Sequence, residues 1–276
     1  MMARWMPVLC VASGMALTAA SGFLAEIATW RVQRESALKA EDGWLSLAGL
    51  FWLHEGANRF GTDDSNDIVL TDGPARAGVF ALQHGQIAMT MNGSTRALKA
   101  DSADVVEVGR LRLFLIQRGE RVGIRVKDPQ SQARREFHGI ESFPAKEAWR
   151  VTARFVSEPR KIPILNVLGQ TEPSDSPGYA VFQLAGQEYR LHPILEEPGA
   201  KQLFFIFRDL TSGKETYAAG RFLDTDLPKD GRVVLDFNKA YNPPCAFTPY
   251  ATCPLPPPEN RLSVRIEAGE KKYGEH

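Results

Sequence analysis

The sequence has few of the residues that carry most metal and nucleophile chemistry. It contains 3 cysteines and 5 histidines in 276 residues. Four of the histidines are scattered, with no two of them one helical or strand step apart: His54, His84, His138 and His192. A metal site needs His, Cys or carboxylate ligands clustered at characteristic spacings. We therefore expect neither a metal site nor a cofactor.

Motifs of several common protein classes are also missing. No Gly-x-Ser-x-Gly elbow of a serine hydrolase occurs, and no glycine-rich phosphate loop opens a helix. Lys plus Arg and Asp plus Glu number 33 each, and no basic run is present. Nucleic-acid binding needs a concentrated basic surface. The composition therefore argues against nucleic acid as a partner.

Residues 1–20 have the pattern of a signal peptide. Arg4 is followed by an uncharged stretch that extends to Ala25. Cleavage after Ala20 would leave small residues, Thr18 and Ala20, at the positions that the peptidase reads. An uncleaved anchor of about twenty residues is the alternative. We expect a periplasmic or secreted protein, with membrane contact only if this segment is retained.

Helical periodicity is confined to the start of the mature chain. Residues 26–40 place apolar side chains on one helical face. Short apolar runs divided by Gly, Asp, Asn and Pro then follow, which is typical of antiparallel β structure. Residues 121–126 and 150–155 alternate polar and apolar side chains, as half-buried strands do.

The predicted fold class is mostly β, after a short N-terminal helix. It is either one antiparallel β-sandwich or two small β units, at residues 43–128 and 145–273. Turn signals at 209–213 and 228–231 predict a three-stranded meander, because each lies between β-like runs. Residues 169–178 contain two prolines and are expected to form an exposed loop.

The most site-like segment is the C-terminal cassette, residues 236–261. Its prolines restrict an irregular loop to few conformations, because their φ angles are fixed. In the predicted meander, Asp236 and Asn238 project from one strand face and Arg221 lies opposite them. An Arg221–Asp236 pair is the testable consequence. It is either a structural ion pair or the polar floor of a ligand pocket.

The two cysteines of the cassette predict a disulfide. Cys10 lies in the predicted signal peptide, which leaves Cys245 and Cys253 as an even pair in an oxidising compartment. Cys245 as a nucleophile activated by His138 or His192 is the alternative. Nothing in the sequence brings either histidine close to Cys245.

Part of the first half resembles a forkhead-associated domain. The likeness consists of Asn-Arg-Phe-Gly-Thr at 58–62, Asn-Asp-Ile-Val-Leu at 66–70 and Asn-Gly at 92–93. In that family an arginine follows the first glycine and a Ser-Arg-x-His segment holds the phosphopeptide. Thr62 and the run Pro-Ala-Arg-Ala-Gly at 74–78 stand at those places here. The resemblance implies β-sandwich geometry without phosphothreonine binding.

A second resemblance covers most of the mature chain. Its motifs are the apolar run at 43–53 and Asp-Phe-Asn-Lys-Ala-Tyr-Asn-Pro at 236–243, followed by Cys245 and by Cys-Pro at 253–254. These motifs resemble the prokaryotic domain-of-unknown-function 1684 family. The resemblance implies no activity, cofactor or catalytic residue.

Two further features have both a structural and a functional interpretation. Trp44, Phe51 and Trp52 are expected at a buried edge of the core, with ligand stacking as the alternative. Arg125 with Asp128, and Arg208 with Asp209, end strands and either solvate a turn or line a cleft.

For function, the sequence favours a binding or accessory protein of the cell envelope. Its partner would be a small molecule or an envelope protein. The expected polar site contains five residues: Arg221, Asp236, Asn238, Tyr241 and Asn242. The alternative is a periplasmic hydrolase that uses Asp236 and Tyr241.

Overall fold

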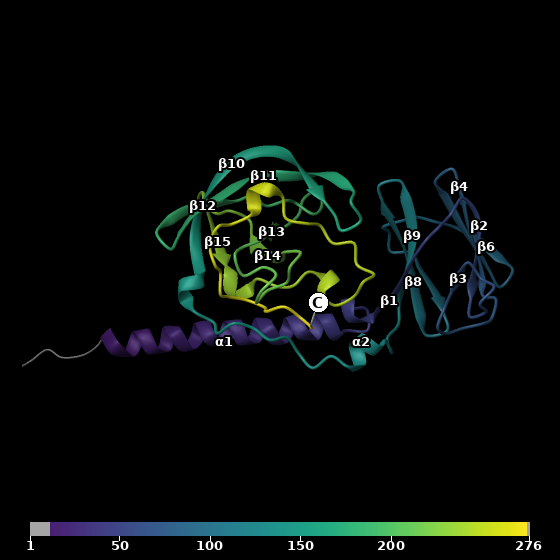
Figure 1. Cartoon of the computed structure of the whole chain (residues 1–276), viewed down its shortest axis with the longest axis horizontal. Coiled ribbons are helices and arrows are strands. Elements are labelled where there is room, and N and C mark those ends of the chain that lie inside the picture. Colours follow the sequence, from purple (N-terminus) through teal and green to yellow (C-terminus); the bar gives the residue numbers. More distant parts are fainter. Residues whose placement is uncertain (1–11, 275–276) are drawn as a thin grey trace, which may run out of the picture.

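The protein folds mostly into antiparallel β-sheets, which confirms the predicted fold class. The computed structural model describes residues 12–274, with side chains from residue 21 onward. The strands fall into two groups that lie side by side, and one long helix runs along the second group (Figure 1).

The first group of strands spans residues 47–127 and forms two sheets. Their strand orders are β1-β9-β8-β7 and β3-β2-β4-β5-β6. These two sheets enclose a separate hydrophobic core. Within it Phe60 and Phe80 are fully buried and stack at 4.5 Å between ring centroids. The forkhead-associated likeness of this region stays a prediction. The strands are β1 (Leu47–Trp52), β2 (Gly56–Gly61), β3 (Ile68–Val69), β4 (Gly78–Gln83), β5 (Gln86–Met91), β6 (Ser94–Leu98), β7 (Val105–Val108), β8 (Leu111–Arg118) and β9 (Arg121–Lys127).

The second group of strands follows the short helix α2 (Gln132–Arg135). One sheet has the order β12-β11-β10-β15, and β13 and β14 form a separate pair. Phe205, Phe207 and Phe237 are fully buried at the centre of its core. The strands are β10 (Arg150–Leu165), β11 (Thr171–Leu184), β12 (Gln187–Leu191), β13 (Gln202–Phe207), β14 (Arg221–Asp226) and β15 (Arg232–Asp236).

The predicted three-stranded meander is only half correct. β13 and β14 pair as a hairpin, with Phe207 opposite Arg221. After the turn at 228–231, however, β15 joins the edge of β10, with Asp236 opposite Arg150. β15 buries Val233 and Leu235 in the same core as Ala153 of β10, and this burial favours the crossing.

The predicted exposed loop at residues 169–178 is wrong, because most of it belongs to β11. β10 and β11 form one long hairpin in which Pro163 lies opposite Pro173. Proline cannot donate a ladder hydrogen bond, so it is tolerated where a strand has few partners. Both prolines of β11 precede Ala180, where pairing with β12 begins.

Helix α1 (Ala12–Lys39) includes the predicted segment and extends it toward the N-terminus. Ile27 and Leu38 on its inner face are almost fully buried. Residues 1–11 of the predicted signal peptide lie outside the described residues, and residues 12–20 form the first part of α1. Within the described part of the chain, no helix is long and apolar enough to cross a membrane.

The C-terminal cassette is irregular; its two ends pack on the second group of strands and its middle reaches the first. It contains three short 3-10 helices, at Phe237–Lys239, Pro244–Ala246 and Pro258–Asn260. Thr248 Oγ1 donates to the backbone oxygen of Leu47 at 3.3 Å, which ties the cassette to β1. The segment is yellow in Figure 1.

Candidate functional site

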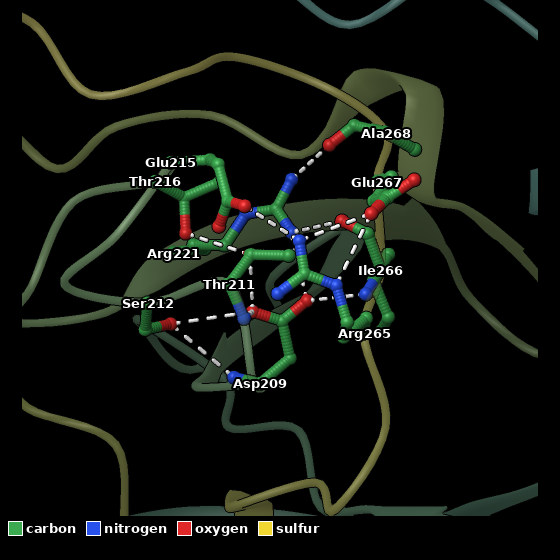
Figure 2. A network of polar contacts seen from close by, with 10 residues as sticks. All are labelled: Asp209, Thr211, Ser212, Glu215, Thr216, Arg221, Arg265, Ile266, Glu267 and Ala268. Atoms are coloured by element: carbon green, nitrogen blue, oxygen red, sulfur yellow. Dashed lines mark hydrogen bonds and ion pairs between the residues drawn. The ribbon is translucent and has the colours of Figure 1, made fainter.

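Arg221 does not contact Asp236, so the predicted pair is wrong. The Arg221 guanidinium is 1% exposed and contacts Asp209 Oδ2 at 3.3 Å. It also donates to the backbone oxygen atoms of Ile266 and Ala268 (Figure 2). The cause is the strand crossing, because β15 pairs with β10 and leaves Arg221 opposite Phe207. Arg221 therefore anchors the C-terminal segment inside the core.

Asp236 pairs with Arg150 instead. Its Oδ2 lies 2.7 Å from Arg150 Nη2, and its Oδ1 accepts hydrogen bonds from the backbone and side-chain nitrogens of Asn238. The carboxylate therefore caps the 3-10 helix Phe237–Lys239. The Asn238 side chain also bonds the backbone of Lys146 through both of its polar atoms. Asp236 therefore forms a structural ion pair, as one of the two interpretations expected, but its partner is Arg150 and not Arg221.

Asn242 is also held by the protein. Its backbone N–H donates to Glu270 Oε2 at 2.7 Å, and its side-chain amide donates to the backbone oxygen of Lys271 at 2.7 Å. Asn242 is 1% exposed. Of the five predicted site residues, Tyr241 is the one that lines the cavity described next.

A cavity of about 470 Å³ lies where α1, both groups of strands and the cassette meet. We refer to it as the central cavity. Its lining combines aromatic and apolar side chains with charged ones, as in many small-molecule sites. Its lining consists of Trp30, Gln33, Arg34, Trp44, Arg118, Arg125, Glu196, Phe204, Phe222, Asp224, Tyr241, Pro244, Thr252, Cys253 and Pro254.

The first group of strands supplies a basic wall to this cavity. Arg125 on β9 lies 5.3 Å from the ring centroid of Trp44, and its Nη2 is 3.5 Å from Thr252 Oγ1. Arg118 on β8 donates to the same Oγ1 at 3.0 Å. Burial, together with the nearby Arg118, lowers the pKa of Arg125 to about 10. Arg125 therefore lines a cleft, and Trp44 faces the same cleft, where it could stack on a ligand.

Arg125 and Arg118 differ in their ion pairing. Among the described residues, no carboxylate lies within ion-pair distance of its guanidinium, and its Nε is buried without a hydrogen-bond partner. Arg118, by contrast, lies 3.4 Å from Asp101. A desolvated cation that lacks a counter-ion is costly, so an anion would be favourable at this place.

The second group of strands supplies an acidic wall made of Glu196 and Asp224. Both carboxyls reach solvent at the cavity mouth, yet the protein around them removes part of their hydration and raises the pKa of each. Tyr241 donates its hydroxyl to Asp224 Oδ2 at 2.8 Å, and burial raises the pKa of Tyr241. Arg34 lies over the Tyr241 ring, 4.6 Å from its centroid.

Cys253 lines the cavity, whereas Cys245 is not among its lining residues. The two sulfurs are free thiols, and the backbone N–H of Cys245 donates to Cys253 Sγ at 3.2 Å. The hydrogen bond between the thiols lowers the pKa of Cys245 and raises that of Cys253. The disulfide stays a prediction. His192 contacts Arg160 and Asn260, so no contact supports its role as a base for Cys245.

No residue of the acidic wall was predicted from the sequence. Asp224 follows Phe222 by two residues on β14, so both project from the same strand face, and Glu196 lies in the turn before β13. A carboxylate on the same strand face as an aromatic residue is a weak sequence signal for a binding site. Nothing in the sequence connects Asp224 with Arg125. Within the described residues, no group of three or more His, Cys, Asp or Glu side chains could hold a metal ion.

A family model described as a protein of unknown function, DUF1684, matches residues 135–271. The chain belongs to the DUF1684 family. The matched segment contains the second group of strands and the whole cassette. The DUF1684 segment therefore supplies the acidic wall, while the basic wall and the α1 side of the cavity lie outside it.

One solved structure shares 32% sequence identity with the chain. It is a solution NMR structure of an uncharacterised protein from Haloarcula marismortui, with a TM-score of 0.44. The match covers 52% of this chain and 81% of that one. None of the curated proteins compared matches the sequence.

Proposed function

We propose that the protein binds a small molecule that carries an anionic group, in the central cavity. One observation carries this proposal. Arg125 lines the cavity, lacks a counter-ion among the described residues and keeps a buried Nε without a partner. A carboxylate or a phosphate fits a guanidinium because two parallel N–H groups can bond two oxygen atoms.

The surroundings of Arg125 support such a role. Trp44 packs against the guanidinium, and the Oγ1 of Thr252 accepts from it, which restricts the orientation of its planar group. Arg118 adds a second positive charge on the same side of the cavity. Pre-oriented donors bind an anion more tightly, because less side-chain freedom is lost on binding.

The uncharged segment at 5–25 supports a location outside the cytoplasm. We therefore place the binding function in the cell envelope or in the medium, with the Cys245–Cys253 disulfide formed there. The alternative is a hydrolase that uses Asp236 and Tyr241. It has less support, because Asp236 is occupied by Arg150 and Asn238 and is not among the residues that line the central cavity.

Isothermal titration calorimetry with a panel of carboxylates and phosphate esters tests the proposal. We expect at least one anion to bind, and Arg125→Met to weaken it about 10-fold or more, since hydrogen bonds between charged groups are strong. Arg125→Lys should recover only part of the loss, because lysine cannot donate in parallel.

Arg121→Met is the matched control. Arg121 lies on the same strand, stacks on Trp52 at 4.0 Å and does not line the cavity. Its replacement should leave the anion affinity unchanged. If no anion in the panel binds, or if Arg125→Met and Arg121→Met have the same effect, the proposal is wrong.

A further inference from the structure

The central cavity holds charges of both signs that do not neutralise one another. Arg125 lies on one side, and Glu196 and Asp224 lie on the other. Among the described residues, no ion pair joins either carboxylate to any cation. Arg34, the nearest helix cation, is engaged by Glu270 at 3.1 Å. Within the described part of the chain, Arg125, Glu196 and Asp224 therefore each lack a partner of opposite charge at ion-pair distance.

Glu196 is the least satisfied of these groups. It makes no hydrogen bond within the described residues, and the charges nearest to it are Asp224 and Glu197, which both repel it. Asp224 accepts one hydrogen bond, from Tyr241. After burial, the negative charge of Asp224 is the next cause that raises the pKa of Glu196, and a positive charge between the two carboxyls would relieve this repulsion.

Aromatic rings surround the acidic wall. Phe204 and Phe222 meet edge to face at 4.7 Å between centroids, and Phe222 meets Tyr241 in the same way at 5.8 Å. All three rings line the cavity. Aromatic rings beside carboxylates form a typical site for an ammonium group, because the ring faces attract cations.

We infer that the ligand is a zwitterion, with its anionic group on Arg125 and Arg118 and an ammonium group between Glu196 and Asp224. Amino acids and short peptides are the chemical class that meets this description. The inference rests on the proposed anion site and adds the second end of the ligand. The aromatic rings of the cavity would then pack against the part of the ligand between its two charged ends.

A series of ω-amino carboxylic acids tests this inference, from 4-aminobutanoate to 8-aminooctanoate. Each is titrated by calorimetry beside the unbranched carboxylic acid of the same chain length, which lacks the amine. We expect the best amino acid to bind about 10-fold more tightly than its amine-free partner. Glu196→Gln with Asp224→Asn should remove most of this advantage and leave the affinity for the amine-free acid unchanged.

Glu197→Gln is the control, because Glu197 neighbours Glu196 in sequence but does not line the cavity. It should keep the preference for the amine. If carboxylates bind through Arg125 but the amine gives no gain at any chain length, the zwitterion inference is overturned and the anion site stands. If no anion in the earlier panel binds, the proposed function fails and this inference fails with it.

Discussion

The guanidinium of Arg34 is bonded to the carboxylate of Glu270, which lies 236 residues further along the chain. Nε of Arg34 is 3.1 Å from Glu270 Oε1, and the side chains are 15% and 3% exposed. The pair joins helix α1 to the C-terminal segment. It also positions Arg34 above Tyr241 at the wall of the central cavity.

Replacing Arg34 with Met should destabilise the fold by about 3 kcal/mol, because it leaves the carboxylate of Glu270 buried without its partner. The free energy of unfolding from urea titration measures the effect. Lys39→Met, an exposed change on the same helix, should stay within about 0.5 kcal/mol of the wild type. Equal stability of the two variants would contradict the structural role of the pair.

The stability should also depend on pH through Glu270. Burial raises the pKa of its carboxyl above the ordinary value of 4.5. In the unfolded chain the group ionises at lower pH than in the folded protein, so the unfolded state binds fewer protons between the two pKa values. The contribution of Glu270 is therefore fully present below pH 4.5 and is lost as the pH rises through the folded pKa.

The free energy of chemical unfolding, measured between pH 4 and pH 8, tests this dependence. Glu270→Gln should remove the part of the pH dependence that comes from Glu270. Glu196 and Asp224 shift in the same direction, so Glu196→Gln with Asp224→Asn measures their share separately. A curve that is identical in Glu270→Gln and in the wild type would show that the buried carboxyl does not control the slope.

Asp236→Ala should lower stability by about 1 to 3 kcal/mol without changing ligand affinity. The variant loses the ion pair with Arg150 and the cap of the helix Phe237–Lys239. Asp226→Ala at the end of the preceding strand β14 is the control, because Asp226 is exposed and its carboxylate makes no hydrogen bond or ion pair in the described chain. A large loss of affinity in Asp236→Ala at normal stability would restore Asp236 to the binding site.

Protein purified from an oxidising compartment should carry no alkylatable thiol at Cys245 or Cys253. The loop between them is short, and its closure would stabilise the fold by about 2.5 kcal/mol in the chain-entropy model. Mass spectrometry after alkylation, with and without prior reduction, provides the measurement. Two alkylated cysteines in the unreduced sample would exclude the bridge.

Local patterns in the sequence predicted much of the fold. The alternation at 121–126 and 150–155 corresponds to β9 and β10, and the apolar face at 26–40 corresponds to the inner face of α1. Each of these signals repeats over neighbouring residues, so one chain segment is enough to detect it. The family was also evident from the cassette.

The partners of individual strands were not predictable in the same way. The turn at 228–231 is present, yet it joins two strands that do not pair with each other. Turn residues fix a reversal of the chain but not which edge the next strand joins, because burial of Val233 and Leu235 decides that. Arg221 and Asp236 were misassigned for this reason alone.

The central cavity could not be read from any one segment either. Its basic wall comes from β8 and β9, and its acidic wall comes from the loop before β13 and from β14, much further along the chain. The sequence allowed two roles for each of two cavity residues. Arg125 was expected either to solvate a turn or to line a cleft, and Trp44 either to lie at a buried core edge or to stack on a ligand. Nothing local could show that the cassette closes the space between these walls.

The boundary of the DUF1684 match divides the walls of the cavity. Residues 135–271 contain Glu196, Asp224 and Tyr241, whereas Arg118 and Arg125 precede the match. A protein that shared only the matched segment would keep the acidic wall and would need another source for the basic wall. In such a modular arrangement, the two ends of a ligand would be selected by separately inherited parts of the chain.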